Sequence, residues 1–203
     1  MKTSDRFPIS DHCDGRRFFN PEGRRLPRFS DVVRWKLGGR AKPWPRRVSI
    51  ATAARRPLSL SETRLTWINH ATVLIETPQG NFLTDPVFSK RCGPLGRLGP
   101  ARTHPPGLAL HELPSIHYVL LSHDHYDHCD LPSLRLIARA HDPVAFTPLG
   151  NGELLKYAGF SRVIELDWWQ ACQRTPNLRI TATPAQHWSS RLGQQRSSRL
   201  WSG

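Results

Sequence analysis

Hydrophobic residues become regularly spaced only beyond about Thr63, where short apolar runs begin to alternate with amphipathic stretches. The apolar, β-prone runs predict strands at 65–68, 71–76, 82–84, 118–122, 144–147, 163–166 and 178–183. Between them, one helix is expected to begin at the N-cap Asp130 and to stop at Asp142, and a shorter one to cover 153–158. Because strands and helices alternate in the second half, the predicted fold class is α/β.

The first sixty residues lack this pattern. They are rich in Arg, Pro and Gly, which predicts an arm lying on a domain, a short helix from Ser30 to Leu37, and a linker over 40–60. We therefore divide the chain into a basic N-terminal arm and linker, residues 1–60, and a folded part, residues 61–203.

Charge follows the same division. Residues 1–60 contain 15 Lys and Arg against 5 Asp and Glu, so they carry +10 of the total charge of +13, whereas residues 61–187 are neutral overall. A basic arm suits an anionic partner, although a solvated Arg-rich extension has the same composition. No apolar run approaches the ~20 residues of a membrane span and no secretory leader is visible, so we expect a cytoplasmic protein, with membrane contact only from the periphery.

The residues with the clearest chemistry lie in one loop, the run 123–128, which has the pattern H-x-H-x-D-H. In an extended loop, residues two apart point the same way, so His123 and His125 can grip one metal ion. Asp127 and His128 lie at the turn into the next helix and can face a second ion. Imidazole and carboxylate together suit Zn²⁺, with Fe or Mn as alternatives. The loop follows a buried strand, where α/β sheets place ligand sites.

Five blocks in this order resemble the metallo-β-lactamase superfamily, and more narrowly the branch that contains N-acylphosphatidylethanolamine-hydrolysing phospholipase D and its bacterial relatives. They are Thr66-Trp67-Ile68-Asn69-His70-Ala71-Thr72, Leu83-Thr84-Asp85-Pro86-Val87-Phe88, the loop 121–130, Leu166-Asp167-Trp168-Trp169 and Pro184-Ala185-Gln186-His187-Trp188-Ser189. The arm, with Phe18-Phe19-Asn20-Pro21, is similar as well. The resemblance implies an αββα sandwich, of which residues 61–203 would form the N-terminal half or slightly more.

The resemblance also implies the roles of the site residues. The implied ligands are His123, His125 and His187 for one zinc ion, and Asp127 and His128 for a second. Asp85 would be a supporting carboxylate for a ligand histidine, although an Asp-Pro turn explains the same residue. His70 matches a family block and would also stand outside the ligands, with a role that the block does not define.

The implied reaction is zinc-dependent hydrolysis of a phosphodiester, of the phospholipase D kind, by attack of metal-bound hydroxide that Asp127 orients. The substrate would be a phospholipid or another phosphodiester, and the basic arm would bring the protein to an anionic membrane surface. No stripe of basic and aromatic residues adjoins the loop, so we do not expect a nucleic-acid partner, and a nuclease of the same superfamily is the weaker alternative.

The resemblance stops at Trp201. In the family, a second half of the sandwich supplies an Asp that bridges the two metals and a last His, and neither has a counterpart in this sequence. We therefore expect one well-supported zinc site and a second, weaker one. The alternative function is an inactive or partner-dependent truncated remnant of such an enzyme, whose uncovered sheet would favour pairing into a homo-oligomer.

Overall fold

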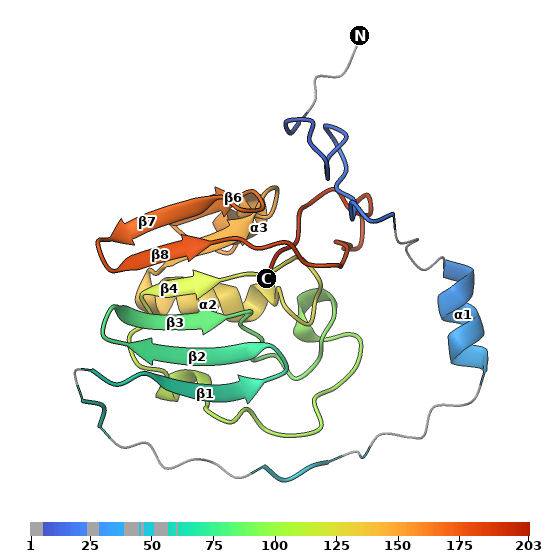
Figure 1. The fold of residues 1–203 in the computed structure, drawn as a ribbon. Coiled ribbons are helices and arrows are strands. Elements are labelled where there is room, and N and C mark those ends of the chain that lie inside the picture. The colour runs from blue at the N-terminus through green and yellow to red at the C-terminus, as the bar shows by residue number, and fades with distance from the viewer. Residues whose placement is uncertain (1–5, 24–28, 39–44, 46, 51–56, 60) are drawn as a thin grey trace.

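A mixed sheet of six strands forms the centre of the computed structural model, which describes residues 6–23, 29–38, 45, 47–50, 57–59 and 61–203. The strands are β1 (Arg64–Asn69), β2 (Thr72–Thr77), β3 (Gly80–Thr84), β4 (Tyr118–Leu120), β5 (Val144–Pro148) and β6 (Arg162–Leu166), and they lie side by side in that order (Figure 1). Neighbouring strands are antiparallel in the pairs β1–β2 and β2–β3. They are parallel in the pairs β3–β4, β4–β5 and β5–β6. The predicted α/β class is confirmed.

Two helices pack on one face of this sheet, α2 (Leu131–His141) and α3 (Gly152–Tyr157) (Figure 1). Leu134 and Ile137 project from α2 into the core and are fully buried. The helix follows the predicted N-cap Asp130 and ends where Asp142 takes a left-handed conformation, with φ of 43°. The end residues predicted from the sequence therefore match the observed ends of α2, and the amphipathic pattern matches the face that the helix buries.

A hairpin of β7 (Ala171–Thr175) and β8 (Leu178–Thr181) covers part of the opposite face. Because side chains alternate along a strand, Val119 and Ala145 face the helices, whereas Leu120 and Phe146 pack with Ile180 of the hairpin. The sequence pattern does not predict β7, because its side chains are mostly polar and exposed and form no apolar run.

Residues 6–23 of the arm pack on the folded part. Phe18 is buried in a cluster with Leu200 and Trp201. His12 places its Nε2 atom 2.8 Å from the carboxylate of Asp167, which lies just after β6. Residues 6–23 are therefore held to the folded part by both apolar contacts and a partly buried polar pair.

The predicted helix in the arm is present as α1 (Phe29–Leu37), and the long loop between β3 and β4 contains only the short 3₁₀ turns η1 (Pro94–Gly96) and η2 (Leu110–Glu112). Most of the linker predicted over 40–60 lies outside the described residues. Within the described part of the chain, no helix has the length and apolar character needed to cross a membrane.

Candidate metal centre

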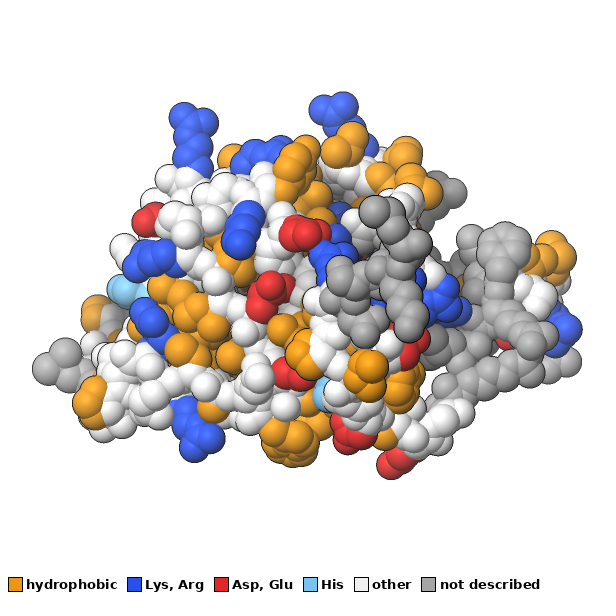
Figure 2. Space-filling model, turned by 90° about the horizontal axis from the view of Figure 1, so that it is seen from above, with side chains coloured by type: hydrophobic (Ala, Val, Ile, Leu, Met, Phe, Trp, Pro, Cys, Tyr) orange, Lys and Arg blue, Asp and Glu red, His pale blue; other side chains and the backbone are white. Residues whose placement is uncertain are grey.

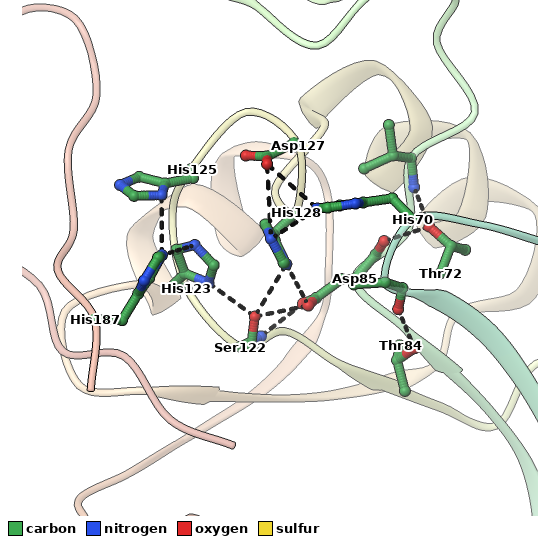
Figure 3. Close-up of polar contacts among 12 residues, drawn as sticks. His70, Thr72, Thr84, Asp85, Ser122, His123, His125, Asp127, His128 and His187 are labelled. Carbon is green, nitrogen blue, oxygen red and sulfur yellow. Dashed lines mark hydrogen bonds and ion pairs between the residues drawn. The ribbon is translucent and has the colours of Figure 1, made fainter. Parts of the chain in front are cut away.

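The predicted site lies at one edge of the sheet, where three distant segments meet (Figure 3). β3 and β4 are parallel neighbours, so Asp85 and the loop 121–130 leave the sheet at the same edge. The backbone N–H of Asp85 donates to the carbonyl of Leu120 at 2.9 Å, which fixes the two strand ends together. The segment after β8 then brings in His187, which is 64 positions from His123 in the sequence.

Three imidazoles form the first group of candidate ligands. The Nε2 atom of His187 lies 2.9 Å from Nε2 of His123 and 3.2 Å from Nδ1 of His125, and the ligand atoms of all three lie within 4.8 Å of one another. Two nitrogens that share a tetrahedral ion at ~2.0–2.1 Å stand ~3.3 Å apart, so these contacts fit one shared ion.

The electrostatics of this group keep its rings neutral, which is the form that binds metal. Burial, reinforced by the surrounding histidines, lowers the pKa of His123 to about 2. Burial also lowers the pKa of His125 and that of His187. Each ring therefore offers a lone pair at neutral pH, and the donor set fits a divalent cation of the zinc type.

A second group lies beside the first and consists of His70, Asp127 and His128. The Nε2 atom of His70 is 3.3 Å from a carboxylate oxygen of Asp127 and 3.3 Å from Nε2 of His128 (Figure 3). His70 comes from the turn between β1 and β2, and the other two come from the loop after β4. The sequence prediction placed His70 outside the ligands, and the structure instead brings its ring into this group.

Asp85 ties both groups to the sheet. One of its carboxylate oxygens accepts from Nδ1 of His128 at 2.7 Å and from the hydroxyl of Ser122 at 2.6 Å, and the other accepts from the Ser122 backbone N–H at 2.7 Å. That hydroxyl lies 2.9 Å from Nδ1 of His123. Asp85 therefore makes contacts of the kind that a supporting carboxylate makes, and the chain bends at this residue, which has φ of 35°.

The partnership with Asp85 changes the protonation of His128. Burial alone would lower the pKa of His128, but the hydrogen bond to Asp85 and the charges of Asp85 and Asp127 outweigh it, so the pKa is raised. Because Nδ1–H donates its hydrogen bond to Asp85, the lone pair of the neutral His128 ring lies on Nε2, on the side of His70.

Asp124, between the first two histidines of the loop, has a structural role that the motif alone does not reveal. It is buried, and one of its carboxylate oxygens accepts from the backbone N–H of Ser190 at 2.8 Å. The other lies 3.5 Å from the guanidinium of Arg199, which is buried too and donates to the carbonyl of Gly150 at 2.8 Å. These contacts join the histidine loop to the segment that follows His187.

The arm reaches the first group through Asn20. Its Nδ2 atom donates to the carbonyl of His187 at 3.0 Å, and its Oδ1 atom accepts from the His187 backbone N–H at 3.3 Å. Sequence reasoning singled out the segment around Asn20 only as a likeness and gave it no role. Its amide holds the backbone of one candidate ligand at two points, from a segment 167 positions away.

Replacing Asn20 with alanine is expected to weaken metal binding by the first group, measured with Zn²⁺ as the probe, about 10-fold, the lower end of what loss of a supporting partner costs a metal site. The reason is that the His187 backbone loses both of its side-chain bonds to the arm. Zinc affinity is measured by competition with a chromogenic chelator. The exposed Asn177, in the turn of the β7–β8 hairpin, gives the control N177A. Equal affinities for N20A and N177A would contradict the role given to the amide.

An open groove of about 1080 Å³ adjoins both groups. His70, Asp127 and His125 contribute to its lining on the side of the candidate ligands, and Trp188 and Leu192 contribute apolar surface. The groove therefore gives the metal ligands direct access to solvent and offers an apolar wall beside them.

The family of the chain follows from the sequence over residues 80–203, which matches the family described as Beta-lactamase superfamily domain. This match covers more than half of the chain, so the protein belongs to that family. The predicted superfamily is thereby confirmed, together with a metallo-β-lactamase-like fold.

Two curated relatives are similar to this chain over about 70% of its length. An uncharacterised protein of Mycobacterium tuberculosis is 38% identical over 143 residues, which are 70% of this chain and 38% of the relative. N-acyl-phosphatidylethanolamine-hydrolyzing phospholipase D 1 of Caenorhabditis elegans is 35% identical over 147 residues, 68% of this chain and 41% of the relative. This chain thus spans about two fifths of the length of these curated relatives.

Among solved structures, Igni18, a metallo hydrolase from Ignicoccus hospitalis, is similar with a TM-score of 0.48 and 20% identity. The similarity covers 66% of this chain and 53% of that one.

Proposed function

We propose that this protein is a zinc-dependent hydrolase that cleaves phosphodiester bonds in the manner of a phospholipase D. The observation that carries the proposal is the pair of three-residue ligand groups, set side by side and joined through Asp85 and Ser122. Two adjacent metal ions suit displacement at phosphorus, because they stabilise the attacking and the leaving oxygen together. The similarity to the C. elegans phospholipase supports the choice of a phosphodiester.

Different residues of the chain would have different roles in such a reaction. When bound, divalent ions would supply Lewis acidity to a phosphoryl oxygen and lower the pKa of water at the site. The residues that would hold them are His123, His125 and His187 in one group and Asp127 and His128 in the other. The carboxylate of Asp127 is 46% exposed and lines the groove, so it is placed to orient an attacking water and to accept its proton.

The groove supplies binding groups for a phospholipid. Trp188 and Leu192 offer apolar surface for an acyl chain, and the Leu192 side chain is 82% exposed. The guanidinium of Arg196 lies over the Trp188 ring, 5.2 Å from its centroid, and its positive charge contributes to the lowered pKa of His125. A phosphodiester in the groove would meet an apolar wall and the ligand groups at once, with the Arg196 cation stacked on one residue of that wall.

The basic arm supports a membrane as the place of action. Residues 1–60 carry a net +10. The face of the molecule seen in Figure 2 also shows Lys and Arg side chains projecting beside apolar ones. Such a surface attracts anionic lipids by about 1 kcal/mol for each basic residue close to the membrane. The arm would then hold residues 61–187, whose net charge is zero, against a phospholipid surface.

The test uses the whole chain, stripped of metal and reloaded with Zn²⁺, Mn²⁺ or Fe²⁺ in separate samples. We expect Zn²⁺-dependent hydrolysis of bis(4-nitrophenyl) phosphate and of N-acylphosphatidylethanolamine in mixed micelles. The variant D127N is expected to lower the rate by about 10²–10⁴-fold, as loss of a general base does. Hydrolysis of carboxylic esters alone would overturn the substrate class, and a folded, metal-loaded chain that hydrolyses none of these compounds would favour the inactive remnant.

A further inference from the structure

We propose that His70 is a direct ligand of the second metal ion, so that this chain by itself closes a three-residue cation site from His70, Asp127 and His128. The sequence predicted only two ligands for this ion. The inference rests on the metal dependence contained in the proposed function and is independent of the phosphodiester substrate.

The spacing of the ligand atoms supports this site. The Nε2 atom of His70 lies 3.3 Å from Nε2 of His128 and 3.3 Å from the Asp127 carboxylate, and the His128–Asp127 distance is 3.8 Å. Atoms that share a tetrahedral ion at ~2.0–2.2 Å stand ~3.3–3.5 Å apart. Two of the three distances match this spacing and the His128–Asp127 distance is slightly longer, so the three atoms form a triangle close to the size that one ion requires.

The lone pairs point to the same place. The Nδ1–H of His128 donates a hydrogen bond to the Asp85 carboxylate at 2.7 Å. The lone pair of that ring is therefore on Nε2, which faces His70. The carboxylate of Asp127 offers only acceptor oxygens when ionised. The lone pair of His128 and the carboxylate of Asp127 thus both face the Nε2 atom of His70. Either a proton on that atom or a cation shared by the three side chains can satisfy all of them.

The backbone at His70 indicates that its position is specifically maintained. This residue has a left-handed conformation with φ of 41°, which is uncommon for residues other than Gly, although His adopts it more often than most. Its carbonyl accepts a hydrogen bond from the indole N–H of Trp67 at 3.0 Å. Backbone strain of this kind persists where the surroundings hold it in place, and it often marks a functional residue.

Like Asp127, His70 is more exposed than His128. Its side chain is 53% exposed, whereas that of His128 is 18% exposed, and it contributes to the lining of the groove. The second ion would therefore sit between the sheet edge and the groove, with His70 as its outermost protein ligand. A ligand in this place also limits how a substrate can approach the ion.

The variant H70N tests the proposal, because asparagine tolerates the left-handed backbone and removes the imidazole. Zinc binding to the stripped whole chain is followed by isothermal titration calorimetry and by metal content after desalting. We expect two zinc ions per chain in the wild type. In H70N the weaker of the two should bind about 100-fold less tightly, the upper end of the cost of losing even a supporting partner. The exposed His111, in η2, gives the control H111A, which should keep both ions.

The first ion serves as the internal control for folding, since its three histidines do not include His70. Two ions bound by H70N with wild-type affinities would overturn the proposal, and so would a wild-type chain that binds only one. A chain that binds two ions, loses one in H70N and hydrolyses no phosphodiester would uphold His70 as a ligand while refuting the proposed substrate class.

Discussion

Replacing His123 with alanine is expected to abolish tight metal binding by the first group and any activity that depends on it. The ring is 4% exposed, its Nδ1 atom lies 2.9 Å from the hydroxyl of Ser122, and its Nε2 atom lies 2.9 Å from His187. Without it, two histidines remain, and two ligands hold a zinc ion weakly. We expect the zinc affinity of this group to fall by more than ~100-fold, which is the upper limit for loss of a supporting partner alone.

The measurement is zinc content after desalting, together with competition against a chelator of known affinity. H111A again provides the matched control, because it makes the same chemical change on an exposed residue outside both groups. Retention of the tightly bound zinc by H123A would show that these three histidines do not form the metal site.

Replacing Asp124 with alanine is expected to lower the free energy of unfolding by about 3–5 kcal/mol, the usual cost of breaking a buried ion pair from one side. The side chains of Asp124 and Arg199 are only 2% and 4% exposed, so the guanidinium is left buried and without its carboxylate. The Ser190 backbone N–H loses its acceptor as well. Urea denaturation followed by tryptophan fluorescence measures the change.

Two further variants make this prediction decisive. In D124L/R199M both charges are removed, so most of the lost stability should return, because apolar replacement of a buried pair is often nearly neutral. In E153A, the ion pair between Arg6 and Glu153 is lost, and these side chains are 46% and 68% exposed, so the change should stay within about 1 kcal/mol. Equal stability of D124A and E153A would contradict the structural role of Asp124.

Much of the fold was predictable from the sequence, because burying one face of a strand or helix gives the hydrophobic residues a regular spacing along the chain. The alternation of the strands and the capped, amphipathic α2 follow from which residues must leave water, and the structure confirms them. β7 was not predictable, since its side chains are mostly exposed and polar, and its pairing with β8 is a matter of backbone hydrogen bonds and not of apolar pattern.

The site was predictable only in part, for a related physical reason. His123, His125, Asp127 and His128 share one loop, so local spacing alone groups them. His187 and His70 reach the same place through the packing of segments that are far apart in the sequence, and no local pattern predicts which segments will meet. The family resemblance supplied His187, whereas the part played by His70 required coordinates. Asn20 and Asp124 form hydrogen bonds with the backbone of other segments, and their residue types alone do not predict these contacts.

The contact between Asn20 and His187 also sets an order of events during synthesis. The two residues are 167 positions apart, and a ribosome that adds ~5–20 residues per second needs roughly 10–30 s to pass from one to the other. Throughout that time the arm has been made but lacks the partner that its amide will hold, and the first ligand group lacks its third imidazole. Capture of the first ion is therefore a late step in the maturation of the nascent chain, and it comes only after the strands of the sheet have been made.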